Sequence, residues 1–159
     1  MLSFLWTTFL GKVLCTFLIS MVPVIELRGA IPIAVANGLP PIVAIPVAVF
    51  GNILPTPFII LFVRSFFDWM KRRIPKLNHF VEKLEQKGES KKGIIQKGEF
   101  LGLLLFVAIP LPGTGAWTGA LIAAMLNMRL KNAFPAIALG VISAGLIVAF
   151  VSYGVAALF

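Results

Sequence analysis

The sequence predicts an all-α polytopic membrane protein, built as an inverted repeat of two units. Each unit is expected to hold a re-entrant helical hairpin followed by a transmembrane helix. Of the 159 residues, 59% are apolar and only 13% are charged, whereas soluble proteins average about 25% charged residues. The runs 29–63, 100–128 and 132–159 contain no charged residue, and each is longer than the roughly 20 residues that cross a bilayer. In addition, the two halves place their short apolar pieces, Pro/Gly breaks, polar turns and long apolar runs in the same order.

The first unit covers residues 1–67. Residues 12–23 and 29–37 are apolar pieces of about three helical turns at most, roughly 17 Å, which is about half of a 30 Å hydrocarbon core. Two half-length helices joined at a break predict a hairpin that enters the membrane and leaves it on the same side. The run 41–63 is then long enough to cross, at about 34 Å. Bends are expected at its prolines, Pro46, Pro55 and Pro57.

Residues 68–97 form the predicted connector, a basic stretch that follows the first spanning run. A proline at position 75 can start a helix. Apolar residues then recur at positions i, i+3, i+4 and i+7, namely Leu77, Phe80, Val81 and Leu84. This spacing predicts an amphipathic helix that lies on the membrane surface.

The second unit covers residues 98–159. A short apolar piece, 98–109, ends at the sequence Pro110-Leu-Pro-Gly-Thr-Gly115, which cannot continue a regular helix. Another short piece, 116–126, leads into a polar turn, and the run 133–159 is expected to cross. The second unit therefore repeats the order of the first.

Charge favours this layout over one in which residues 98–126 cross the membrane completely. A complete crossing would place Arg129 and Lys131 opposite the basic connector, against the tendency of Lys and Arg to lie in the cytoplasm. If the segment is re-entrant, every Lys and Arg except Lys12 and Arg28 lies on one side.

These patterns predict a location as well as a topology. We expect residues 1–159 to form a single membrane domain in the cytoplasmic (inner) membrane of a prokaryote. Residues 64–99 are expected to be cytoplasmic and both termini to be outside.

Glu26 and Arg28 are the leading candidates for a functional site. They lie two residues apart within mostly apolar sequence, and an ionisable side chain at membrane depth is a functional candidate because it is costly to place there. The nearby prolines and glycine suggest a broken helix whose backbone lines a polar cavity. Two alternatives are an interfacial pair at the edge of a loop and a static ion pair that holds the hairpin tip.

The other candidate residues come from the two breaks and their flanks. Thr114, Thr118 and Trp117 could add hydrogen bonds and an aromatic wall, and Asn52 is a polar residue in an apolar span. For Asn52 the alternative role is a bond to a neighbouring helix, and for the glycines it is close helix packing. The substrate- or ion-binding candidates are Glu26, Arg28, Gly29, Pro32, Asn52, Pro110, Pro112, Gly113, Thr114, Gly115, Trp117 and Thr118.

Two stretches resemble a known family. Glu26-Leu-Arg-Gly-Ala-Ile-Pro32 and Pro110-Leu-Pro-Gly-Thr-Gly-Ala-Trp-Thr-Gly119 resemble the signature stretches of the small multidrug export protein family, which is thought to be distantly related to the DedA/VTT membrane proteins. The resemblance covers essentially the whole chain. It implies paired re-entrant hairpins, each packed on a spanning helix, and, from the DedA relatives, transport or flipping of lipids and lipid carriers.

The chain departs from those relatives in one respect. They carry an acidic residue and an arginine in each functional region, whereas the second hairpin here has no charged residue. Only Glu26, Arg28 and the Pro/Gly breaks are therefore carried over.

The predicted function is that of a transporter or flippase for an anionic small molecule or lipid-carrier head group. The second half-helix of each hairpin would point its N-terminus at the midplane, where free N–H groups favour an anion. Arg28 would add a cation that fits phosphate or carboxylate. Glu26 would neutralise Arg28 until the anion displaces it, with a proton on Glu26 accompanying or opposing the movement.

The alternatives are an exporter of cationic drugs and a non-transporting membrane scaffold. An enzyme is not expected, because the sequence lacks a recognisable catalytic or metal-binding constellation, and neither a cofactor nor a nucleic-acid partner is expected. The expected partners are membrane lipids, a small anionic or lipid-linked substrate and protons. The short chain would enclose little cavity alone, which favours a homodimer.

Overall fold

The computed structural model describes residues 6–73, 92–111 and 113–156, and this part of the chain holds helices and no strand. In chain order the helices are α1 (Phe9–Met21), α2 (Glu26–Ala36), α3 (Pro41–Ile53), α4 (Thr56–Arg73), α6 (Lys92–Ala108), α7 (Ala116–Met125) and α8 (Leu130–Ala156). The all-α prediction is therefore confirmed. The amphipathic helix predicted after Pro75 lies outside the described residues.

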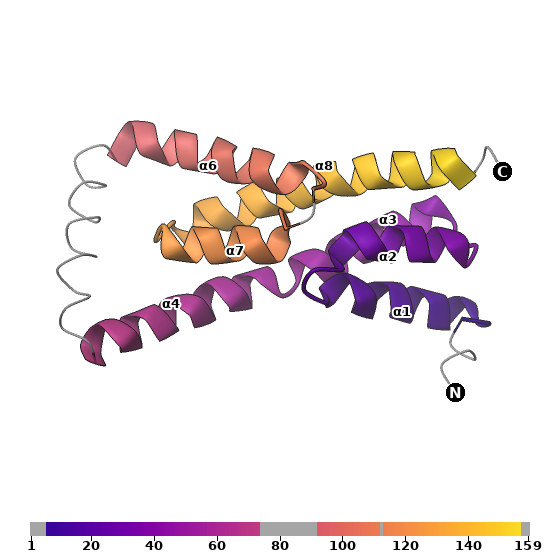
Figure 1. Ribbon diagram of the computed structural model, residues 1–159, viewed down its shortest axis with the longest axis horizontal. Coiled ribbons are helices and arrows are strands. Elements are labelled where there is room, and N and C mark those ends of the chain that lie inside the picture. The colour runs from indigo at the N-terminus through magenta and orange to yellow at the C-terminus, as the bar shows by residue number, and fades with distance from the viewer. Residues whose placement is uncertain (1–5, 74–91, 112, 157–159) are drawn as a thin grey trace.

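Two helical hairpins approach each other from opposite ends of the molecule (Figure 1). α1 packs against α2, and α6 packs against α7. The turn between α1 and α2 and the turn between α6 and α7 both lie near the middle of the long axis. The apolar helices Phe9–Met21, Gly98–Ala108 and Ala116–Met125 are each shorter than a complete span.

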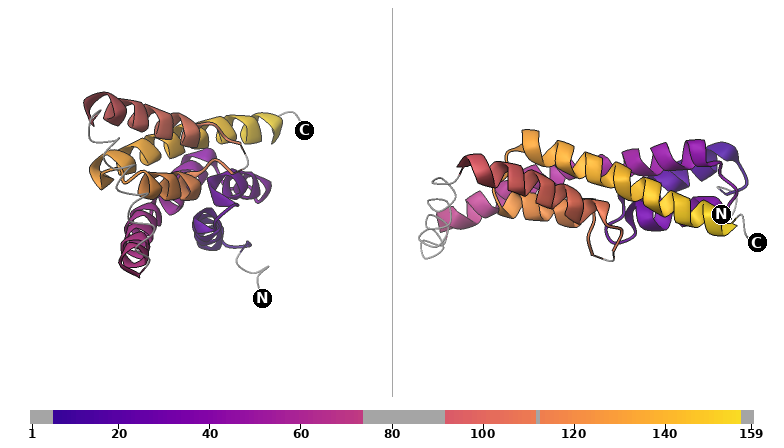
Figure 2. Two further views of the ribbon diagram at one scale, coloured as in Figure 1. Left: turned by 60° about the vertical axis from the view of Figure 1, so that its left-hand side comes forward. Right: turned by 90° about the horizontal axis from the view of Figure 1, so that it is seen from above.

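Two longer paths run along the molecule beside the hairpins. Residues 41–66 and 130–155 are each 26 residues long and apolar enough to cross a membrane. α8 is one continuous helix that passes beside both hairpins, as the turned views also show (Figure 2). The first path is divided into α3 and α4.

The division falls at Leu54 and Pro55, and Pro55 is one of the three prolines at which a bend was predicted. Pro55 has no N–H, so the carbonyl of Gly51, four residues earlier, has no helical donor. The sequence predicted bends here but placed the end of the spanning run at Val63. The helix instead continues to Arg73, so the first residues of the predicted connector are helical.

Small residues let the helices approach closely. A methyl group added to Gly140 on α8 or to Gly119 on α7 would overlap Val107 of α6, and one added to Gly51 on α3 would overlap Ser20 and the backbone of α1. Alanines fill much of the remaining core, including Ala30, Ala48, Ala116, Ala120 and Ala136, all fully buried. This packing is typical of membrane helices and agrees with the packing role that the sequence suggested for most glycines.

The outer surface is strongly apolar. Large side chains such as Leu10, Ile42, Phe62 and Phe150 are between 74% and 83% exposed. In water such a surface would be an aggregation hazard, whereas a lipid environment solvates it. Together with the two long apolar paths, it indicates a membrane protein.

Side-chain hydrogen bonds hold three segments of the chain together at one end of the molecule. Lys12 on α1 donates to the carbonyl of Asn37 at 2.5 Å, and Tyr153 on α8 donates to the carbonyl of Leu39 at 2.7 Å. The start of α1, the turn between α2 and α3, and the last turns of α8 therefore lie together. The end of α4, the start of α6 and the turn between α7 and α8 lie at the opposite end (Figure 1).

Candidate functional site at the hairpin tips

The turn between α1 and α2 has an unusual backbone. Val24 and Glu26 have φ angles of 76° and 49°, in the left-handed region that residues with a Cβ atom rarely adopt, and a β-branched valine least of all. Such conformations cost of order 1–3 kcal/mol each and cluster at functional sites. The turn brings the first residues of α2, with Glu26 and Arg28, against the other hairpin.

The side chain of Glu26, the first residue of α2, lies at the N-terminus of α7. Its side chain is only 5% exposed, and its carboxylate accepts hydrogen bonds from the backbone N–H groups of Trp117 at 3.1 Å and Ala116 at 3.3 Å. The first N–H groups of a helix have no partner within the helix, and the helix dipole makes this end positive. The carboxylate therefore occupies a position suited to an anion.

Gly115 makes room for this carboxylate. It precedes α7 as the N-cap residue and offers no side-chain cap of its own. A Cβ atom built on Gly115 would overlap all three terminal atoms of the Glu26 side chain. Position 115 therefore requires a glycine because the Glu26 carboxylate of α2 approaches its backbone closely.

Arg28 binds the other side of the same break. Its guanidinium donates to the carbonyls of Leu111 and Ile109, the latter at 3.1 Å, and to the hydroxyl of Thr114 at 3.1 Å. The Thr114 hydroxyl in turn donates to the carbonyl of Ile109 at 2.7 Å. α6 ends at Ala108, so these carbonyls lie beyond the helix, at the end where a cation is stabilised.

The hydrogen bonds of Glu26 and Arg28 have a feature that the predicted ion pair did not include. The hydrogen bonds of both side chains go to the second hairpin, the carboxylate to the start of α7 and the guanidinium to the end of α6. Each charge meets the backbone dipole of opposite sign. The break leaves the first N–H groups of α7 without a helical partner, which the Glu26 carboxylate supplies. The carbonyls of Ile109 and Leu111 accept from Arg28 in addition to the backbone N–H groups of Leu111 and Thr114, at 2.8 and 3.2 Å.

Trp117 makes the reciprocal contact. Its indole Nε1–H donates to the carbonyl of Met21, the last residue of α1, at 3.1 Å. Arg28, near the start of α2, and Trp117, near the start of α7, therefore each bind carbonyls at the end of the first helix of the other hairpin. The sequence gives no signal for the carbonyl of Met21 in particular, because every residue has a carbonyl.

The remaining candidates take less part in this contact. Thr118 is half-buried on α7, and no hydrogen bond joins it to the described residues of either tip. Gly113 has a φ angle of 84°, which favours glycine. The others lie as follows: Gly29 packs against the side chain of Ile25, Pro32 lies exposed within α2, Pro110 is half-buried after α6, and Pro112 lies outside the described residues.

Asn52 lies away from these hydrogen bonds, on α3 next to Gly51. It is 1% exposed, and neither its amide nitrogen nor its oxygen has a hydrogen-bond partner in the described protein. The bond to a neighbouring helix suggested by the sequence is not formed.

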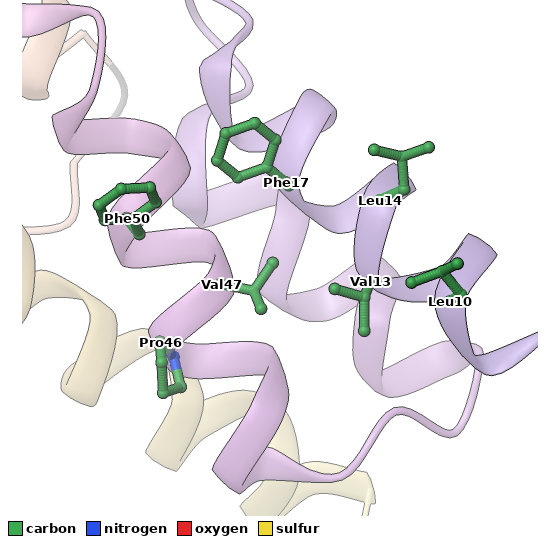
Figure 3. Close-up of a pocket in the computed structure, with 7 residues that line it drawn as sticks. All are labelled: Leu10, Val13, Leu14, Phe17, Pro46, Val47 and Phe50. Carbon is green, nitrogen blue, oxygen red and sulfur yellow. The ribbon is translucent and has the colours of Figure 1, made fainter.

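An apolar groove of about 380 Å³ lies between α1 and α3 (Figure 3). Its lining consists of Leu10, Val13, Leu14 and Phe17 from α1 and Pro46, Val47 and Phe50 from α3. The rings of Phe17 and Phe50 stack at 6.2 Å. No polar side chain lines the groove, so it offers nothing to a charged group, and the candidate site remains at the tips.

Comparison with protein families identifies one match. The model of a family described as "Putative small multi-drug export protein" matches residues 26–147, about three-quarters of the chain. The matched region begins at Glu26, the first residue of α2, and includes the turn between α6 and α7. Comparisons with curated proteins and with solved structures found no significant match.

Proposed function

The chain belongs to the small multi-drug export protein family, whose description points to a membrane transporter, and from this membership we propose a transport site at the hairpin tips. The substrate that we propose is an anionic small molecule or the anionic head group of a lipid carrier. It passes between the two hairpins, where Glu26 and Arg28 meet the break between α6 and α7.

The observation that supports this proposal most directly is the Glu26 carboxylate at the start of α7. This carboxylate is bound by the N–H groups of Ala116 and Trp117, in the space left by Gly115. The position therefore accommodates an anionic group of this size. An incoming phosphate or carboxylate would replace it on the same donors. Arg28 supplies the permanent positive charge of the site and would release its carbonyl acceptors as the anion arrives.

Proton coupling follows from the same exchange. A protonated Glu26 carries no charge, so it binds the positive end of α7 less strongly. Protonation would thus favour release of the N–H groups to the substrate, and loss of the proton would favour return of the carboxylate. In this scheme a proton and an anion occupy the contact together.

We place the site at the membrane midplane. α1 has 13 residues and α7 has 10, or about 20 and 15 Å of helix, less than a 30 Å core. Hairpins of this length that enter from opposite ends support a pair of re-entrant elements in an inverted repeat, with residues 64–99 cytoplasmic and both termini outside. The same arrangement supports the proposed distant relationship to the DedA/VTT proteins.

Reconstituted vesicles test this function. Movement of a polyprenyl phosphate, a phospholipid and a cationic dye is compared with and without a pH gradient. We expect the phosphate-bearing substrate to move faster than in empty vesicles, and both Glu26→Gln and Arg28→Lys to lower its rate by about tenfold or more, because each removes a charge or the two-pronged donor. Arg129→Lys, at an exposed arginine far from the tips, is the matched control and should transport normally.

The same experiment separates the alternatives. Movement of the dye alone, retained in Arg28→Lys, would identify an exporter of cations. The family description favours this alternative, whereas the half-buried positive charge of Arg28 opposes it. Absence of movement for all three substrates in folded protein would support a scaffold. Normal transport by both tip variants would remove Glu26 and Arg28 from the mechanism.

A further inference from the structure

Arg64 on α4 has a chemical feature that the tip contact does not explain. Its side chain is half-buried, and two of its nitrogens, Nε and Nη2, are buried without a hydrogen-bond partner among the residues that the structure describes. These two nitrogens are neighbours on one edge of the guanidinium. Their N–H groups form the side-on fork that binds two oxygens of a carboxylate or phosphate.

The buried side of α4 explains where this fork is held. Thr56 and Ile60 are fully buried, and Arg64 follows at the same four-residue spacing, so it lies on the same face of the helix. α4 packs against α7. Arg64 therefore continues a stripe that faces the interior rather than the lipid.

The simplest alternative partner is already occupied. The end of α7 could accept a hydrogen bond from an arginine, but the carbonyls of residues 122 to 124 are bound by the backbone of the following turn. Leu126, Asn127 and Met128 donate to residues 122, 124 and 123 at 2.9, 3.1 and 3.0 Å. Arg64 does not cap α7, and its fork is left for another acceptor.

The depth of Arg64 indicates the kind of acceptor. It lies near the end of the apolar path 41–66, about ten residues and so roughly 15 Å from the joint between α3 and α4. Trp69, which is 57% exposed, follows within two helical turns, and exposed tryptophans mark the interface between hydrocarbon and head groups. Phosphate groups are the oxyanions that a membrane offers at this depth.

We propose that Arg64 forms a second anion site, which binds one phosphate group side-on between α4 and α7. The ligand chemistry is a phosphate oxyanion, supplied by a lipid head group or by a soluble phosphate compound. This inference stands independently of transport at the tips, because it uses none of the tip residues.

Thermal unfolding of the purified full-length protein in detergent tests the site. Phosphatidylglycerol, phosphatidylcholine and inorganic phosphate are titrated separately into the wild type, Arg64→Lys, Arg64→Ala and the control Arg129→Ala. We expect phosphatidylglycerol to raise the unfolding temperature of the wild type and the control more than phosphatidylcholine does. Both Arg64 variants should need roughly tenfold more phosphatidylglycerol for half of the shift. Lipid retention by native mass spectrometry gives the same comparison if Arg64→Ala folds poorly, since Arg64→Lys keeps the charge and most of the stem.

Each further outcome decides one point. A wild-type shift with inorganic phosphate that is lost in Arg64→Lys assigns the site to soluble phosphates, and a shift confined to phosphatidylglycerol assigns it to lipid. Equal responses in the wild type and both Arg64 variants would overturn the proposal. The variant Asp68→Asn gives a second test, because Asp68 follows Arg64 by one helical turn. If Asp68→Asn weakened the response to phosphatidylglycerol as much as Arg64→Ala does, Arg64 would be the partner of Asp68 in an ion pair, and the proposal would be overturned.

Discussion

At the scale of single residues, the break between α6 and α7 sets the requirements. In a membrane no water binds the free N–H groups of a helix start or the free carbonyls of a helix end, so protein groups must do so. Glu26 and Arg28 meet both needs from the other hairpin. The sequence could single out these two residues, because charges within apolar sequence are conspicuous. It also predicted hydrogen bonding by Thr114, which accepts from Arg28, but it could not identify the individual backbone groups that complete the contact.

Gly115 gives the sharpest test at this scale. Gly115→Ala should lower the free energy of unfolding by about 1–3 kcal/mol, because its methyl group overlaps the Glu26 carboxylate and forces it to move. Transport should fall with it. Chemical unfolding in detergent and the vesicle assay measure the two effects.

The matched control for this prediction is Gly102→Ala. An added Cβ at Gly102, within α6, meets open space, so the substitution should be neutral or stabilise by up to about 1 kcal/mol through helix propensity. Equal effects at the two glycines would show that the carboxylate does not depend on the space at Gly115.

At the scale of elements, the prolines predicted where a helix could be interrupted but not whether it would end there. Pro55 lies at the joint between α3 and α4, whereas Pro46 and Pro135 lie within α3 and α8 without dividing them. Each proline removes one backbone donor. Packing by neighbouring helices then decides whether the helix continues, and the sequence does not display that packing.

The joint between α3 and α4 should respond to two substitutions unequally. Pro55→Ala restores an N–H group to the carbonyl of Gly51 and should raise the free energy of unfolding by about 0.5–1.5 kcal/mol. Pro57→Ala restores one to Ile53, whose carbonyl already accepts the Thr56 hydroxyl at 2.7 Å, so its effect should be smaller. Unfolding of both variants in one detergent measures the difference. A larger gain from Pro57→Ala would contradict the assignment of the unpaired carbonyl to Gly51.

At the scale of the whole molecule, helix lengths and Pro/Gly breaks predicted the elements well. The hairpins, their turns near Glu26 and after α6, and the two long paths all follow from apolar lengths and breaks. The attraction between Glu26 and Arg28 stays a prediction, and the structure adds that the hydrogen bonds of both side chains go to the other hairpin. The turn that directs them there depends on the left-handed backbone at Val24 and Glu26, for which neither residue type gives a signal.

Topology is the prediction that belongs to this scale. In a variant without Cys15, a cysteine at position 37 should react with an impermeant thiol reagent from outside, and a cysteine at position 129 only from the cytoplasm. The reason is that these two turns lie at opposite ends of the molecule (Figure 1), and the basic residues favour the cytoplasm for the second. Labelling in whole cells and in inverted vesicles measures both. Reaction of position 129 from outside would remove the re-entrant interpretation.

The reciprocal hydrogen bonds at the tips bear on the direction of flow. Arg28 donates to the end of α6, while Trp117 donates to the end of α1, so each hairpin holds the other closed by the same means. Opening this contact from either end breaks the same bonds. In the proposed transport scheme the protein would therefore favour neither direction, and the gradients of substrate and protons would decide between export and uptake.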